Sequence, residues 1–237
     1  MILRRAPQHL PAPHSSRLIA CLLLVVAFAS CEMNDYDKGN GKYSTLHADF
    51  AEVTTKQSKT LVAAALDNGD SLTLQPALAC EWAEAPATTY RALLYYYPTD
   101  NEGIVKPYGA QPVYVLPWHD EYSKPATTLT DPLHVEATWM SHNKAYINLR
   151  VGIMVGTDDE GNRQSQQIGV TLDNTHTHTD GTHTYQLTLR HAQNDVPQYY
   201  TSTQYLSLPL NGCTTGDTIS LSVNTYDGQQ HYTFCYQ

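Results

Sequence analysis

The sequence predicts an all-β protein that folds as an antiparallel sandwich or barrel, and three observations support this. No long stretch of the 237 residues repeats its apolar side chains at the helical period. Short runs instead alternate apolar and polar residues between turn residues, which is the pattern of half-buried strands. Tyr is abundant, with 17 residues against 3 Phe, and Tyr, Thr and Val fit a pleated, half-buried surface.

The first half of the chain after residue 44 contains short predicted strands. Asn68-Gly69 interrupts two alternating segments, and Asn-Gly is the strongest short-range signal for a hairpin. Pro107, Pro112 and Pro117 confine the later strands to sheet edges or to short pieces. The predicted strands lie within residues 46–54, 59–76, 90–98 and 104–117.

The second half alternates more regularly. Ile147, Leu149 and Val151 share one face of their strand, and Ile153 and Val155 continue that face. A turn at Asp227-Gly228 is expected to join the last two strands into a hairpin. The predicted strands lie within residues 134–140, 145–156, 167–172, 184–189, 203–210, 217–226 and 230–236.

A proline-rich stretch at 117–132 has little apolar content and separates the two halves. We therefore expect two domains, one at residues 45–122 and one at residues 123–237. No internal repeat is visible in either half.

The N-terminus has the pattern of a lipoprotein signal peptide at residues 1–30. The apolar run 18–29 is shorter than the roughly 20 residues that a membrane-spanning helix needs. Arg4, Arg5 and Arg17 precede it without an acidic residue, as export signals require. Small residues lead to Cys31, as in a bacterial lipobox, although Phe28 replaces the usual Leu. A plain secretory signal with an incidental Cys31 is the alternative.

If the lipobox is used, the mature chain begins at Cys31, which carries acyl chains such as palmitate. Several chains on one residue would anchor the protein firmly, because each buried CH₂ contributes about 0.8 kcal/mol. Residues 31–44 are polar and contain glycine, which is typical of a flexible tether. We expect a protein anchored by lipid in the outer membrane, facing either the cell surface or the periplasm.

The charge balance argues against nucleic acid as a partner. The sequence has 23 Asp and Glu against 14 Lys and Arg, a formal net charge of −9. Binding to nucleic acid requires basic surfaces that displace counterions from phosphates. Of the five cysteines, Cys80, Cys213 and Cys235 remain after Cys21 and Cys31 are assigned to the signal and the lipid. The turn at 227–228 places Cys235 too far from Cys213 for a disulfide.

Several segments together resemble the NigD-like lipoproteins. They are the lipobox, "YRALLYYY", "DPLHVEATWMSHNKAYINLRVGI", "LTLRHAQND" and "GDTISLSVNTYDGQQHYTFCY". The resemblance implies an N-terminal OB-like β-barrel followed by a C-terminal β-sandwich. The family takes its name from a protein linked to bacteriocin production and suspected of an immunity role. No catalytic residues are known for the family, so the resemblance assigns none here.

The segment "THTHTDGTHTY" at 175–185 suggests a metal site. A two-residue turn at Asp180-Gly181 would place His178 opposite His183, with His176 diagonal to His183 on the same face. Three imidazoles so placed could hold Zn²⁺ or Cu²⁺. The alternative is a solvated hairpin tip with no metal, and a slip of one residue would scatter the three histidines.

Aromatic residues beside the proline-rich stretch suggest a ligand site. Trp118 and Tyr122 could line a groove between the domains, or they could simply pin the linker. His191 lies at the end of a predicted strand, where a histidine is more often a structural hydrogen-bond partner than a catalyst.

No sequence motif for catalysis is present: we find no G-x-S-x-G elbow, H-E-x-x-H helix, P-loop or G-x-G-x-x-G. We therefore expect a lipid-anchored binding module without enzymatic activity, whose partner is a protein, a peptide or a glycan. Two alternatives are a bacteriocin-immunity protein and a metal-binding protein. The oligomeric state is not predicted.

Overall fold

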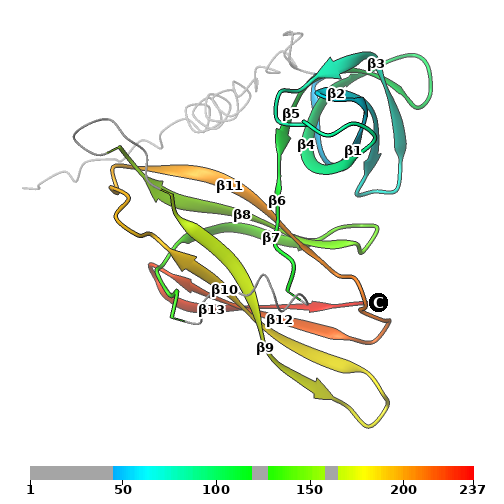
Figure 1. The fold of residues 1–237 in the computed structure, drawn as a ribbon. Coiled ribbons are helices and arrows are strands. Elements are labelled where there is room, and N and C mark those ends of the chain that lie inside the picture. The colour runs from blue at the N-terminus through cyan, green and yellow to red at the C-terminus, as the bar shows by residue number, and fades with distance from the viewer. Residues whose placement is uncertain (1–44, 119–127, 158–164) are drawn as a thin grey trace, which may run out of the picture. The chain divides into compact units, whose positions relative to one another are not determined.

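The structure is a computed structural model that describes residues 45–118, 128–157 and 165–237. The described residues form 13 strands (Figure 1). They contain no helix long and apolar enough to cross a bilayer. The predicted signal peptide, Cys31, the tether and Tyr122 lie outside the described residues.

The N-terminal domain is a closed five-stranded barrel in the order β1-β2-β3-β5-β4. Its neighbouring strands are antiparallel except β3 and β5, which are parallel. A closed five-stranded Greek-key barrel is the architecture of the OB fold. The strands are β1 (His47–Gln57), β2 (Thr60–Leu66), β3 (Ser71–Ala79), β4 (Thr89–Pro98) and β5 (Ile104–Pro112).

The predicted hairpin at Asn68-Gly69 is confirmed and joins β2 to β3. Gly69 has a φ of 98°, in the left-handed region that favours glycine. The side chain of Asn68 accepts a hydrogen bond from the N–H of Asp70 at 2.9 Å. Inward-facing side chains of the barrel form a closed core, which includes Val53, Leu61, Leu74, Leu94 and Val105.

The C-terminal domain is a sandwich of two four-stranded sheets, with the orders β13-β12-β10-β9 and β6-β11-β8-β7. Its pairs are antiparallel except β10 with β12 and β6 with β11. The strands are β6 (Tyr114–Val115), β7 (His134–Met140), β8 (Tyr146–Val155), β9 (Gln167–Thr177), β10 (His183–Ala192), β11 (Tyr200–Pro209), β12 (Thr218–Thr225) and β13 (Gly228–Cys235). The predicted all-β class, with an OB-like barrel before a sandwich, is confirmed.

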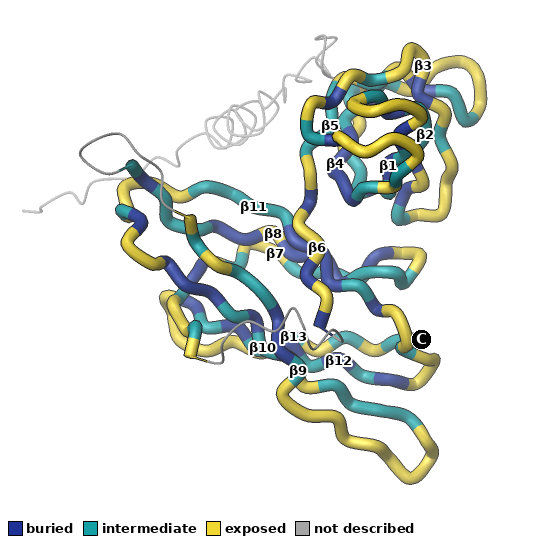
Figure 2. Tube along the Cα trace, viewed as in Figure 1, coloured by how far each residue is buried: buried dark blue, intermediate teal, exposed yellow. Residues whose placement is uncertain are grey.

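The sandwich core is built from alternate residues of both sheets (Figure 2). Ile147, Leu149 and Val151 of β8 are fully buried, as their alternation predicts. Ile153 and Val155, at the end of the same strand, are only partly buried. The core therefore stops before β8 ends.

The transition between the domains comes earlier than residue 122. Tyr114 and Val115 pair with Leu206 and Ser207 of β11, so they belong to the sandwich and not to the barrel. The N–H of Leu116 donates to Ser207 O at 2.9 Å. The proline-rich stretch suggested a later boundary, but the chain leaves the barrel at the end of β5 and enters the second sheet almost at once.

A buried polar network joins the barrel to the outer face of the sheet β6-β11-β8-β7. Arg91 of β4 forms a two-pronged ion pair with Asp67, at 2.6 Å for each hydrogen bond. Its guanidinium also donates to Asn148 at 3.1 Å and to Ser207 at 3.2 Å. The guanidinium carbon lies 4.1 Å from the ring centre of Tyr146. Because alternate residues of a strand face opposite ways, this contact uses the outer face and leaves the inner face to the core.

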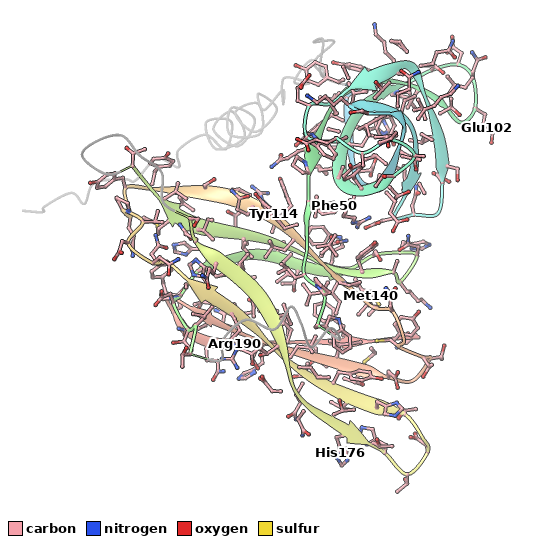
Figure 3. All side chains as sticks on the ribbon, viewed as in Figure 1. Phe50, Glu102, Tyr114, Met140, His176 and Arg190 are labelled. Atoms are coloured by element: carbon pink, nitrogen blue, oxygen red, sulfur yellow. The ribbon has the colours of Figure 1, made fainter. Side chains whose placement is uncertain are left out.

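An aromatic cluster supports the same contact. Phe50 of β1 packs edge-to-face against Trp139 at 5.3 Å and against Tyr205 at 5.6 Å between ring centres. The Tyr146 hydroxyl donates to Glu52 at 2.6 Å. Phe50 is labelled in Figure 3. The two domains thus share one interface of buried charge, hydrogen bonds and aromatic rings.

Candidate binding groove

A groove lies between the two sheets at the end of the sandwich where the packed core stops. Its volume is about 590 Å³. Side chains from β6, β8, β9, β10, β11 and the adjoining loops line it: Tyr114, Ile153, Val155, Gly156, Ser165, Gln166, Ile168, His191, Val196, Tyr200, Ser202, Gln204 and Leu206.

The sequence of β11 explains why the groove exists. Leu206 and Leu208 face inward and are buried in the core. Towards the start of the strand, the same face continues with Gln204, Ser202 and Tyr200, which line the groove. Polar side chains cannot fill an apolar core without hydrogen-bond partners. The sheets therefore enclose an accessible, partly polar space here instead of a closed core.

His191 forms part of the groove wall and is fixed by hydrogen bonds. Its Nε2 lies 2.8 Å from Gln166 Oε1, and Gln166 Nε2 donates to Met154 O at 2.6 Å. Its Nδ1 lies 3.3 Å from Asp131 O. The ring is 2% exposed, and burial lowers the pKa of His191 despite the nearby Asp131. Both ring nitrogens thus lie beside oxygen acceptors, which fits the structural role expected for this histidine.

Exposed aromatic residues border the groove. Tyr114 and Tyr200 are 57% and 54% exposed, and Tyr199 is 68% exposed. Tyr114 projects from β6, next to β11 (Figure 3). None of the described residues that line the groove is Asp, Glu, Lys or Arg. The described lining therefore combines apolar side chains with uncharged hydrogen-bonding groups.

The three-histidine site does not form, because the hairpin register differs by one residue from the predicted one. His183 pairs with Thr177, and Thr184 pairs with His176. The connection has three residues instead of two: the N–H of His178 donates to Thr182 O at 2.8 Å. Gly181 takes a φ of 86°, as in three-residue hairpin loops.

The shifted register places the histidines on opposite faces of the hairpin. The rings of His176 and His178 lie 4.7 Å apart, and His178 Nε2 is 2.8 Å from Thr184 Oγ1. His183 points the other way, where its Nδ1 lies 3.3 Å from Asp217 Oδ1. His176 is labelled in Figure 3. Among the described residues, no group of three or more His, Cys, Asp or Glu could hold a metal ion.

Trp118 does not line a groove between the domains. It is 0% exposed and belongs to the sandwich core. Its indole N–H donates to Pro209 O at 2.7 Å, and its ring packs against Tyr185 at 5.2 Å between centres. The proline-rich context suggested a linker residue, whereas burial of so large a ring contributes to the core. Tyr122, its predicted partner, lies outside the described residues.

The cysteines of the described residues form no disulfide. Cys80, Cys213 and Cys235 are free thiols, in line with the expectation that Cys213 and Cys235 do not pair. Cys235 lies opposite Thr218 in the sheet. Burial, with a contribution from Asp217, raises the pKa of Cys213 to about 11. That thiol is therefore protonated at neutral pH.

The fold and the groove define a class: a two-domain all-β protein in which an OB-like barrel precedes a sandwich with a groove between its sheets. Residues 117–236 match the family described as "NigD-like C-terminal beta sandwich domain". This match spans just over half of the chain, and the chain belongs to the NigD-like family.

Solved structures with the same fold span both domains. One, described as a toxin-related protein from Parabacteroides distasonis, has a TM-score of 0.61 and 18% identity, covering 81% of this chain and 93% of that chain. A second is described as a NigD-like immunity protein from Bacteroides caccae, with a TM-score of 0.58 and 18% identity, covering 81% and 98%.

A third, described as a lipoprotein from Bacteroides fragilis, has a TM-score of 0.53 and 12% identity, covering 81% and 98%. At these identities the likeness establishes the fold alone. The comparison with curated proteins finds no match.

Proposed function

We propose that this protein is a lipid-anchored binding module of the bacterial cell envelope and that the groove of the sandwich holds its partner. Cys31 supplies the anchor, and residues 32–44 connect it to the barrel. The observation that carries the proposal is the uncharged groove of about 590 Å³. Ligand sites in proteins are concave and mostly apolar, with a few well-placed polar groups.

The polar side chains of the groove face the inside of the sandwich, where a purely structural strand would carry apolar residues. Ser202 and Gln204 occupy the face that Leu206 continues into the core. The polar network at Arg91 fixes the barrel to the opposite face of the same sheet. The sheet therefore supports a domain contact on one face and a binding groove on the other.

Photo-crosslinking in living cells tests this proposal. A benzophenone amino acid in place of Tyr200 would stand at the groove, and one in place of Thr233, which is exposed on β13, serves as the control. We expect a specific crosslinked product from position 200 that is absent at position 233. Ser202→Trp, which fills the groove, should remove the product. Equal products at both positions would contradict the proposal.

A second candidate function is protection against a bacteriocin, and it rests on the structural neighbour that is described as an immunity protein. Deletion of the gene should then sensitise the cells to culture supernatants of related bacteria. The intact gene should restore resistance, and a copy with Cys31→Ser should restore less because it lacks the anchor. Unchanged sensitivity across a broad panel of supernatants would argue against this function.

A further inference from the structure

We propose that the groove takes an extended, uncharged peptide segment of a partner protein, which pairs as an added strand with the free edge of β11. The inference rests on the proposed binding function and specifies its ligand. Strand addition supplies affinity through backbone hydrogen bonds and specificity through alternate side chains that enter pockets.

The edge of β11 is open over its first five residues. β11 pairs with β8 along its whole length, from Tyr200 to Pro209. On its other side it pairs with β6, and only at Leu206 and Ser207. Residues 200–204 therefore extend past the end of β6 with one side unpaired among the described strands.

The direction of the backbone groups follows from two hydrogen bonds. Ser207 O accepts from Leu116 N at 2.9 Å, and Pro209 O accepts from Trp118 Nε1 at 2.7 Å. The backbone N–H and C=O groups of odd-numbered β11 residues therefore point away from β8. By the same alternation, Thr201 and Thr203 present their N–H and C=O groups at the open edge, and Tyr205 presents its N–H there. Among the described strands only β6 and β8 pair with β11, so no strand pairs with Thr201 and Thr203 on this side.

Other edges of the sandwich carry features that hinder pairing. The pairing of β7 is interrupted between Val135 and Ala137, where Glu136 binds Arg150 at 2.6 Å. The pairing of β9 is interrupted where it meets Gln186 and Leu187. Bulges and charges of this kind protect natural edge strands from added strands. β11 pairs with β8 in a continuous register, and its residues 200–205 include no charge and no proline.

The groove adjoins this edge and supplies the side-chain recognition. β13 also forms an edge of continuous register, but none of its residues lines the groove. An added strand beside β11 would direct alternate side chains towards Ile153, Ile168 and Val196. The described lining carries no Asp, Glu, Lys or Arg to pair with a charged side chain, so these positions favour Val, Ile, Ser or Thr. Six residues of strand span about 20 Å.

Thr203 offers a variant that separates strand pairing from folding. Its N–H points away from β8, so Thr203→Pro removes one edge donor without removing a bond of the sheet. Proline is tolerated in strands at such edge positions. Thr203→Val is the matched control: like proline it lacks the hydroxyl that donates to Glu136 at 3.2 Å, but it keeps the backbone N–H.

The experiment uses the chain from residue 32 to 237 and fluorescein-labelled six-residue peptides that alternate Val or Ile with Ser or Thr. Fluorescence polarisation measures their affinity, and urea unfolding checks that each variant is folded. We expect peptides of this set to bind the parent and Thr203→Val equally. Binding to Thr203→Pro should be at least tenfold weaker. Peptides with Lys or Glu at the alternate positions, or N-methylated along one edge, should bind poorly.

Two results would overturn the inference. One is the failure of every peptide to bind the parent at millimolar concentration. The other is equal binding to Thr203→Pro and Thr203→Val. If peptides bind Thr203→Pro and Thr203→Val equally but do not bind Ser202→Trp, the groove still holds the peptide and only the strand pairing is wrong. If Ser202→Trp also has no effect, the proposed binding function of the groove fails as well.

Discussion

Arg91 places a guanidinium, whose side chain is 2% exposed, in the interface between the barrel and the sandwich. Its charge is balanced by Asp67, and Asn148 and Ser207 accept its remaining hydrogen bonds. Breaking a buried ion pair by removing one partner is costly, because the other charge stays buried without compensation. The stability of the two-domain arrangement should therefore depend strongly on this one residue.

Arg91→Ala should lower the free energy of unfolding by about 3–5 kcal/mol, as measured by urea denaturation. The double variant Arg91→Leu with Asp67→Leu should lose clearly less, since it removes both charges. Arg150→Ala provides a control, because Arg150 is half exposed in its ion pair with Glu136, and such pairs are worth about 0–1 kcal/mol. Equal losses in the single and double variants would contradict this account.

His191 should make stability depend on pH. Burial lowers its pKa below the ordinary 6.5, so the unfolded chain takes up a proton before the folded protein does. The contribution to stability is complete above pH 6.5 and is lost as the pH falls from 6.5 towards the lowered pKa. The free energy of unfolding, measured with urea between pH 8 and 5, should depend less on pH in His191→Gln than in the parent protein. The difference in slope should reach up to about 1.4 kcal/mol per pH unit. Identical slopes would refute the assignment.

At the scale of elements, the hairpin of β9 and β10 shows how one extra loop residue decides whether three histidines share a face. Its turn residues, Asp180 and Gly181, were identified correctly from the sequence. A two-residue and a three-residue loop are both compatible with Asp-Gly, and the choice moves every side chain on one strand to the other face. His183 consequently faces Asp217 and not His176 and His178.

The hairpin should not bind zinc through its three histidines. Isothermal titration of residues 32–237 with Zn²⁺ should show no one-to-one site in the micromolar range, because two imidazoles on one face supply too few ligands. His178→Ala should leave the titration unchanged, and His231→Ala serves as a comparison elsewhere on the sandwich. A stoichiometric site that disappears in His178→Ala would show that the hairpin adopts another register in solution.

At the scale of the whole molecule, the OB-like fold is compatible with binding to nucleic acid, whereas the net charge opposes it. OB-like barrels commonly bind single-stranded nucleic acids through basic grooves and stacking rings. This chain has a formal net charge of −9. Electrostatic attraction to phosphates supplies most of the non-specific affinity for nucleic acid, so the barrel should repel it.

Residues 32–237 should therefore leave a labelled single-stranded DNA of 30 nucleotides unshifted in an electrophoretic assay at physiological salt. The same assay at low salt is the stricter version, because screening is weakest there. A complex that appears at low salt and weakens with added salt would contradict the expectation.

If the protein is lipid-anchored, as proposed, its orientation determines where its partner is found. Protease added to intact cells should digest the protein if its domains face outwards, and a periplasmic marker must survive in the same sample. Digestion would place the groove at the cell surface, in line with the acidic residues after Cys31, which loosely resemble a surface-export signal of some Gram-negative bacteria. Survival until the outer membrane is broken would place the groove in the periplasm.

The sequence by itself determined the all-β class, the hairpin at Asn68-Gly69 and the buried face of β8, because period-two alternation and turn residues act locally. The NigD-like segments added the order of the two domains. The domain boundary depended on the pairing of Tyr114 with Leu206, which joins residues far apart in the sequence. Trp118 lies in the core for the same reason.

The groove is decided by tertiary structure alone. From the neighbouring sequence, Ser202 and Gln204 look like ordinary polar residues of a strand. Only the packing of the second sheet shows that they face inward. In the sequence, the one signal for this position is that Ser202 and Gln204 alternate in step with Leu206 and Leu208, and so share their face of the strand. Strand faces follow from neighbours along the chain, whereas an open edge and an unfilled space depend on which strands fail to meet.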